Sequence, residues 1–176
     1  MSATTIGTIL QDVILKAKPQ LLALSEAEVS TKPSPEKWSK KQILGHLVDS
    51  AGNNHQRFVR IQQQEQLIFP GYEQAKWVEH QQYQEADWEM LVEFWSLYNL
   101  HLGRVISLIP DELFYKVFEP DDHNMHLITM RRVDKGDSSN LAYFVYDYVG
   151  HLEHHLKQLL PDYQSQTPSF TNPVLT

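Results

Sequence analysis

The amino-acid sequence predicts an all-α protein, folded as a four-helix bundle. Four long stretches carry apolar side chains at steps of three and four residues, which is the spacing of one buried helix face. Segments rich in proline and polar residues separate these stretches, and long amphipathic helices in one short chain pack as a bundle. The 176 residues suffice for one core, so we expect a single domain over residues 1–176.

The first two helices are predicted over residues 4–24 and 39–66. Two prolines, Pro33 and Pro35, mark the loop between them. The second helix has a well-marked start, because Ser39 and Gln42 have the spacing of a capping box. Gly52 lies in the middle of this helix and indicates a bend or a close contact with another helix.

The second half of the chain is predicted to hold the other two helices, over residues 84–109 and 139–160. Residues 67–83 are predicted to be a loop that packs its aromatic rings against the bundle. The 113–137 stretch is the least regular, and its β-forming residues leave a small hairpin open as an alternative to a loop. Residues 161–176 are predicted to be a loose tail.

Composition excludes several functional classes. The net charge of −7 argues against binding to nucleic acid or to an anionic membrane surface. The chain has no cysteine, which excludes disulfides, thiolate ligands and a cysteine nucleophile. No apolar run approaches the length of a membrane span, and the first residues lack the basic start of a signal peptide, so a cytoplasmic location is expected.

The distribution of the nine histidines is the most informative feature for function. On a helical wheel of the fourth helix, His151 and His155 lie one turn apart at the border of the apolar face, whereas His154 lies on the polar side. Two imidazoles at this spacing can chelate one ion. The pattern leaves open the alternative that both are ordinary residues at the edge of the core.

The second helix adds a polar stripe along the border of its own apolar face. His46, Ser50, Asn53 and Arg57 form this stripe, and Asn54 lies within the apolar face itself. Buried polar groups are costly unless they are satisfied, so the stripe indicates a pocket rather than simple packing. One histidine from this helix and two from the fourth would form an open three-nitrogen site, which is typical of catalytic metal centres.

The same segments resemble the DinB-like, or YfiT-like, superfamily of metalloenzymes over residues 35–160. The resemblance is carried by Lys37-Trp38-Ser39, by the segments 43–51 and 54–58, by the loop from Phe69 to Val78, and by Asp147-Tyr148-Val149-Gly150-His151-Leu152-Glu153-His154-His155-Leu156-Lys157-Gln158. It implies a four-helix bundle that binds one divalent ion, zinc or nickel, through His46, His151 and His155.

The resemblance also implies an activity, although fold membership alone does not settle a reaction. Characterised relatives are S-transferases of low-molecular-weight thiols such as bacillithiol, or thiol-linked isomerases, and many others are described as metal-dependent hydrolases. We therefore expect a metal site that activates a thiol or water for attack on a small molecule. A hydrolase, or a bundle that binds a metal or ligand without turnover, remains the alternative. The expected partner is a small-molecule substrate, and a homodimer is compatible with the sequence.

Several further residues are candidates for the site. Arg57 is predicted to hold a substrate carboxylate and Asn54 to hydrogen-bond substrate or water, although ion pairing and packing are the alternatives. Asp49 and Asp147 have the spacing to orient an imidazole. Other weaker expectations are that Tyr72 and Trp77 close the mouth of the pocket, that His123 and His126 form a second small site, and that the remaining histidines are unpaired surface residues: His55, His80, His101 and His154.

Overall fold

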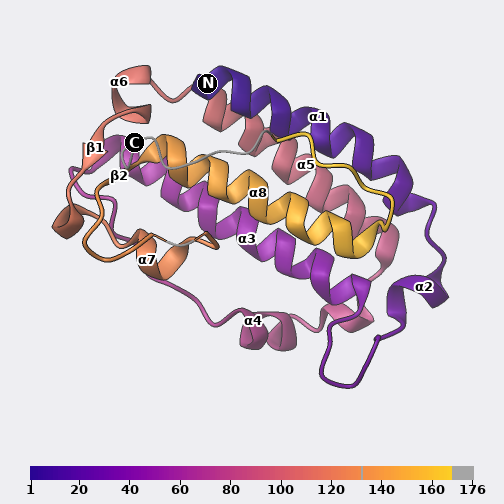
Figure 1. Ribbon diagram of the computed structural model, residues 1–176. Coiled ribbons are helices and arrows are strands. Elements are labelled where there is room, and N and C mark those ends of the chain that lie inside the picture. Colours follow the sequence, from indigo (N-terminus) through magenta and orange to yellow (C-terminus); the bar gives the residue numbers. More distant parts are fainter. Residues whose placement is uncertain (132, 168–176) are drawn as a thin grey trace.

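The computed structural model describes residues 1–131 and 133–167 and confirms the predicted all-α class (Figure 1). Each long helix buries one apolar face in a common core. The four long helices are α1 (Ala3–Leu22), α3 (Lys40–Arg60), α5 (Trp88–Ser107) and α8 (Leu141–Leu159).

The arrangement of the helices determines which residues can meet. Helices α1 and α3 each pack against both α5 and α8, so α5 and α8 lie diagonally across the bundle. Helices α3 and α8 run antiparallel, with Phe58 beside Phe144 at one end and His46 beside His155 at the other. Helices α3 and α5 run in the same direction, because the segment between them returns along the bundle (Figure 1).

The connections contain more helix than the sequence predicted. A short helix α2 (Glu26–Ser30) follows α1, and helix α4 (Gln74–His80) and the 3-10 turn η2 (Tyr83–Glu85) lie where a loop was expected. Helix α3 ends at Arg60 and continues only as the 3-10 turn η1 (Ile61–Gln63). The last turns of the predicted helix therefore do not form as α-helix.

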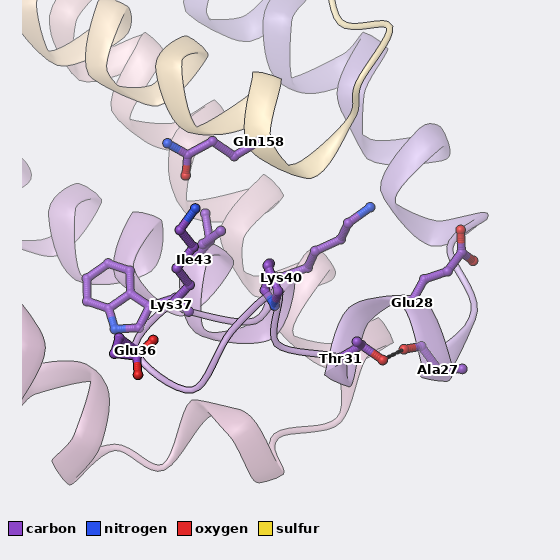
Figure 2. A pocket seen from close by; sticks show the side chains of 10 residues that line it. Ala27, Glu28, Thr31, Glu36, Lys37, Lys40, Ile43 and Gln158 are labelled. Atoms are coloured by element: carbon purple, nitrogen blue, oxygen red, sulfur yellow. Dashed lines mark hydrogen bonds between the residues drawn. The ribbon is translucent and has the colours of Figure 1, made fainter.

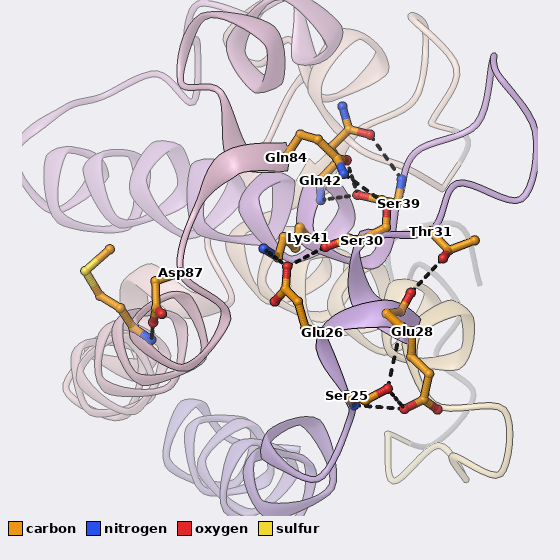
Figure 3. Close-up of polar contacts among 12 residues, drawn as sticks. Ser25, Glu26, Glu28, Ser30, Thr31, Ser39, Lys41, Gln42, Gln84 and Asp87 are labelled. Carbon is orange, nitrogen blue, oxygen red and sulfur yellow. Dashed lines mark hydrogen bonds and ion pairs between the residues drawn. The ribbon is translucent and has the colours of Figure 1, made fainter.

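The start of α3 is held by a network of polar contacts (Figure 3). The predicted capping box is present, because the Ser39 hydroxyl accepts from the Gln42 amide and the Gln42 side chain accepts from the Ser39 amide. The Ser39 hydroxyl also donates to Gln84, whose amide donates to the Ser30 carbonyl. Buried Lys41 forms a 2.7 Å ion pair with Glu26. These contacts fix the first turns of α3 against α2 and η2.

The irregular stretch between α5 and α8 contains a small sheet, but its described residues form no hairpin within 113–137. Strand β1 (Val117–Phe118) pairs antiparallel with β2 (Ser139–Asn140), which immediately precedes α8. The intervening residues include the short helices α6 (Asp111–Phe114), η3 (Pro120–Asp122) and α7 (Met125–Ile128). The β-forming residues at 127 and 128 are therefore in α7 rather than in a strand.

The prediction of a loose C-terminal tail is wrong for residues 161–167. Tyr163 is buried and donates to the Glu153 carboxylate at 2.7 Å. The backbone amides of Gln166 and Thr167 donate to the same carboxylate. Glu153 is itself buried, so these three donors satisfy a charge that would otherwise be costly. The remainder of the predicted tail, 168–176, lies outside the described residues.

Among the described helices, none combines the length and the apolarity needed to cross a membrane.

Candidate metal centre and adjoining cavities

Three histidines from two antiparallel helices meet in the interior of the bundle. His46 is on α3, and His151 and His155 are one turn apart on α8. The ring centroids are 5.1 Å apart for His46 and His151, 5.0 Å for His46 and His155, and 4.7 Å for His151 and His155. One nitrogen from each ring lies within 4.8 Å of the others. The structure thus brings together the three residues that the sequence singled out.

The environment keeps these imidazoles neutral. Burial lowers the pKa of His46 to about 4, with a smaller contribution from repulsion by His155. Burial, assisted by the neighbouring histidines, lowers the pKa of His151 to about 2, and burial also lowers the pKa of His155. A neutral imidazole has a free lone pair, which is the form that binds a metal.

One ring has its tautomer selected by a neighbouring side chain. The His155 Nδ1 lies 3.2 Å from the Gln158 Oε1, which can only accept a hydrogen bond. Nδ1 therefore carries the proton and Nε2 presents its lone pair to the interior. This partner is the kind of group that usually orients a metal-binding histidine. Sequence analysis missed Gln158, although its position three residues after His155 could have indicated it.

The three rings fit a divalent transition ion. His46 Nε2 and His151 Nε2 are 3.2 Å apart. Two nitrogens that bind one zinc ion tetrahedrally at about 2.0–2.1 Å are separated by about 3.3–3.4 Å, so this spacing suits a shared ion. Imidazole nitrogens also match the preference of zinc and nickel for such donors. His46 Nδ1 and Asp49 Oδ2 are buried without a hydrogen-bond partner among the described residues.

A polar cavity of about 290 Å³ adjoins the histidine cluster. Its walls come from α3, α8, the loop before α4 and the segment around α7. The lining residues include both α8 ligand candidates, the two α3 residues Asn54 and Arg57, and the following neighbours: Ser50, Tyr72, Gln74, Leu127, Ile128, Thr129, Met130, Phe144, Asp147, Tyr148 and His154.

Arg57 is the most unusual residue of this cavity. It is 5% exposed, and burial lowers the pKa of its guanidinium. Its Nη2 donates to the Pro70 carbonyl at 3.0 Å and its Nη1 to the Asn54 Oδ1 at 3.3 Å. The ion pairs found among residues 1–131 and 133–167 do not include Arg57. A buried cation without an acidic partner lining a cavity is a candidate site for an anionic group.

Asn54 is held in place by its own helix. Its Nδ2 donates to the Ser50 carbonyl at 2.9 Å and lies 3.3 Å from the Ser50 hydroxyl. Its Oδ1 accepts from Arg57. The side chain is therefore occupied by protein contacts, and in this arrangement it orients Arg57 toward the cavity.

Asp49 and Asp147 were predicted to orient the metal-binding histidines, but their hydrogen bonds are to other residues. Asp49 accepts from the Tyr83 hydroxyl at 2.8 Å and from the Gln81 amide at 2.6 Å. Asp147 accepts from the backbone amides of Met130 and Arg131, so it fixes the segment that covers the cavity. Burial raises the pKa of both carboxyl groups.

The predicted aromatic closure is partly present. Tyr72 lines the cavity, and burial raises the pKa of its hydroxyl to about 12, so the hydroxyl is neutral near pH 7. Trp77 packs on Tyr72 with ring centroids 5.0 Å apart, but it is not among the residues that line the cavity. Trp77 thus supports Tyr72 from outside.

A second and larger hollow is lined by residues of α2, of the loop before α3, of the start of α3 and by Gln158 of α8 (Figure 2). This groove of about 930 Å³ runs between α2, the start of α3 and the end of α8. Gln158 and Trp38 both line it. Gln158 contacts His155, and the Trp38 ring lies 5.2 Å from the His46 ring. The groove therefore shares its wall with the residues that surround the proposed ligands.

The other histidines differ in part from the prediction. His80 is exposed, as expected. His55 and His101 are not isolated, since their ring centroids are 5.3 Å apart and His55 Nδ1 lies 3.2 Å from the Tyr98 hydroxyl. His154 is exposed but contacts Gln158.

His123 does not fit the suggested second metal site. Its Nε2 lies 2.8 Å from the Asp137 carbonyl, and its Nδ1 accepts from the Met125 amide. Both ring nitrogens are thus used in protein hydrogen bonds, and the side chain is buried. Among the described residues, the only group of three metal-binding side chains found is His46, His151 and His155.

Comparison with known proteins agrees with this fold. The family model of the DinB superfamily matches residues 17–159. A solved structure, YfiT from Bacillus subtilis, is similar with a TM-score of 0.71 and 19% identity, over 90% of this chain and 84% of that one. It is described as a probable metal-dependent hydrolase with an unusual four-helix bundle topology. No curated protein matches the sequence. The extent of the family match shows that this chain belongs to the DinB superfamily.

Proposed function

We propose that the protein is a metal-dependent enzyme that activates a small nucleophile for attack on an electrophilic small molecule. His46, His151 and His155 would hold one divalent ion, zinc or nickel. The observation that carries the proposal is the convergence of three neutral imidazoles beside a cavity that is lined by two of them, His151 and His155, and by buried Arg57, which has no acidic partner among the described residues. A divalent cation held in this way would lower the pKa of a thiol or water that reaches its open position.

The chain's own residues bind and orient the substrate. The Arg57 guanidinium has a planar set of N–H donors that can form two hydrogen bonds to one carboxylate. Because Arg57 is buried, the electrostatic attraction between its guanidinium and a substrate carboxylate is stronger than it would be in water. Asn54 orients this guanidinium through its Oδ1. Gln158 keeps His155 in the tautomer that leaves Nε2 unprotonated. Tyr72 and the segment around α7 cover the cavity and limit the entry of water.

We favour transfer of a thiol to a second organic molecule. A transferase must place two organic substrates at one centre. His151 and His155 line the smaller cavity, and the larger groove is lined by Trp38 and Gln158, which contact His46 and His155. The smaller polar cavity suits an electrophile with an acidic group, because Arg57 lines it. The larger groove suits the carbon skeleton of a thiol, because the apolar side chains of Ile43 and Trp38 line it.

Hydrolysis is the second candidate, since the smaller cavity is polar and can admit water beside a single substrate. The similarity to YfiT, itself described as a probable metal-dependent hydrolase, supports testing it. A hydrolase would not require the larger groove.

The two reactions can be separated experimentally. Cobalt-substituted protein should change its d–d absorption when a low-molecular-weight thiol is added, and the metal-loaded protein should then conjugate that thiol to electrophiles. Ester or amide turnover that vanishes on chelation, without a spectral response to any thiol, would instead identify a hydrolase. Absence of turnover in both assays would contradict an enzymatic role and leave a metal- or ligand-binding bundle.

The proposed role of Arg57 gives a substrate-specific test. Replacing Arg57 with Gln should raise KM for carboxylate-bearing substrates while changing kcat little, because this contact is made equally in the ground state and the transition state. Neutral analogues of the same substrates should be affected much less. An equal loss for acidic and neutral substrates would show that Arg57 only supports the local structure.

A further inference from the structure

The residues that line the smaller cavity differ in their burial. We call the buried lining residues, which include Arg57, Phe144 and Asp147, the floor of the cavity. We call the exposed lining residues the rim: Gln74, Leu127, Met130 and His154. Leu127 is 70% exposed and Met130 is 45% exposed. The cavity thus combines a buried cation in its floor with two large apolar side chains at its rim.

The segment that carries the two apolar rim residues is fixed by hydrogen bonds. The Asp147 carboxylate accepts from the backbone amides of Met130 and Arg131, at 2.8 and 2.7 Å. The Thr129 hydroxyl lies 2.8 Å from the Met125 carbonyl and 2.9 Å from the Arg131 carbonyl. These bonds hold the main chain of the segment, so its apolar side chains stay at the rim instead of turning into the core.

The position of these side chains indicates a ligand. A single exposed apolar side chain is common on protein surfaces and needs no explanation. Leu127 and Met130, however, line the same cavity as Arg57. Exposed apolar groups beside a pocket are typical of ligand-binding sites, because a ligand that covers them removes their surface from water.

The floor provides the binding site for an acidic group. The hydrogen bonds from Arg57 to Pro70 and Asn54 use two of the five N–H donors of its guanidinium, so further donors can bind a ligand. The guanidinium lies 5.8 Å from the centroid of the Phe144 ring, which supports it from one side. Each Asp147 oxygen accepts from one backbone amide, so this carboxylate is directed at the covering segment.

We propose that the substrate of this cavity is an amphiphilic organic acid, whose carboxylate binds Arg57 and whose alkyl or aryl body lies against Leu127 and Met130. The volume of about 290 Å³ is at the lower end of the range of about 300–1,000 Å³ for small-molecule pockets, so a substrate of ordinary size reaches the rim. The inference rests on the proposed function and narrows its electrophile to acids with an apolar body. A small hydrophilic diacid would instead leave the apolar rim exposed to water.

Calorimetric titration of the purified full chain with butanoate and octanoate tests the apolar part of the site. Octanoate should bind at least about tenfold more tightly, because each methylene that leaves water contributes up to about fourfold in affinity. Both acids carry the same carboxylate, so any contribution of a bound ion to affinity cancels in the ratio.

The double variant Leu127→Gln/Met130→Gln should bind butanoate as the wild type does, but octanoate only a few-fold more tightly than butanoate. Both side chains are exposed, so the helical circular dichroism should be unchanged. The matched control is Leu15→Gln/Met90→Gln, because these residues are 59% and 64% exposed and do not line the cavity. This control should keep the wild-type ratio. Equal binding of the two acids by the wild type, or a wild-type ratio in the rim variant, would overturn the proposal.

The acidic part of the site is tested with Arg57→Gln and with octanamide, the neutral analogue of octanoate. Arg57→Gln should weaken butanoate and octanoate by the same factor and leave octanamide unaffected, which also shows that the variant is folded. Octanamide that binds the wild type as tightly as octanoate, or no binding of octanoate, would contradict the inference. None of these measurements depends on turnover. Missing catalysis with an intact dependence on chain length would therefore contradict the enzymatic role alone.

Discussion

At the scale of single residues, neighbouring histidines on one helix have different roles. His154 and His155 are adjacent in sequence, but only His155 points its ring into the cluster with His46 and His151. The difference follows from the turn of about 100° per residue, which places consecutive side chains on different faces. The two residues have the same side chain at adjacent positions, so substitutions at them form a matched pair.

We expect His155→Ala to deplete bound zinc or nickel and His154→Ala to leave the content near one ion per chain. The reason is that only His155 can supply a ring nitrogen to the three-histidine group. Metal analysis of both variants, purified in parallel, gives the measurement. Equal loss of metal from the two variants would contradict the assigned ligands.

The buried histidines should also make the metal-free protein sensitive to mild acid. The pKa of His46 and of His151 is lowered in the folded state, to about 4 and about 2, so the unfolded chain binds protons that the folded chain does not. The free energy of unfolding should therefore fall as the pH drops below about 6.5, by up to about 1.4 kcal/mol per pH unit for each such histidine.

Urea unfolding of the chelator-treated protein between pH 7.5 and pH 5 measures this dependence. His46→Gln removes one of these buried histidines and should reduce the slope of the unfolding free energy against pH. An unchanged slope in the variant would show that other groups cause the acid sensitivity.

At the scale of elements, the two glycines within α3 illustrate how packing decides the effect of a residue. A side chain at Gly45 would collide with the Tyr83 ring, whose hydroxyl is bonded to Asp49. A methyl group at Gly52 would meet only the Tyr98 ring at 3.8 Å, an ordinary contact. Gly52 therefore does not mark the close helix contact that the sequence offered as one alternative, and α3 continues through it as one helix.

Gly45→Ala should destabilise the protein by about 1–3 kcal/mol, because the added methyl forces Tyr83 out of place. Gly52→Ala should stabilise it by about 0.5–1 kcal/mol, since alanine loses less conformational entropy than glycine in a helix. Thermal or urea unfolding of the two variants gives both values. The same sign for both changes would contradict this account of α3 packing.

At the scale of the whole molecule, the core is complete without a metal ion. All four long helices bury apolar residues in one cluster, and the histidine group occupies one region of their interior. An ion that binds only the folded state adds stability through mass action, about 2.7 kcal/mol at a hundredfold excess over Kd. Because the apolar core joins all four helices, we expect the fold to persist without this contribution.

Chelation should accordingly lower the melting temperature while leaving the helical circular dichroism spectrum at 25 °C unchanged. Re-addition of zinc or nickel to the chelated protein should restore the original melting temperature. Loss of helical signal on chelation would show a structural ion, which would weaken the proposal of an open catalytic site.

The sequence by itself determined the helical class and the approximate positions of the four helices. It also determined which three histidines face the interior of the bundle. These features depend on local periodicity and on the turn of a helix, both of which are encoded within one segment. The capping box at Ser39 was predictable for the same reason, because its two residues are three positions apart.

Only the tertiary structure decided the partners of the polar residues and the shape of the connections. The Tyr83 hydroxyl donates a hydrogen bond to Asp49, Arg57 donates to the Pro70 carbonyl, and the Tyr163 hydroxyl donates to Glu153. Strand β1 pairs with β2 some twenty residues later. Each of these contacts joins groups from different segments, and their strength depends on burial, which the packing of the whole chain sets. The exposed apolar residues of α5, Met90, Phe94 and Leu97, were recognised only in this way, because they resemble core residues until the fold shows which side of the helix the bundle covers.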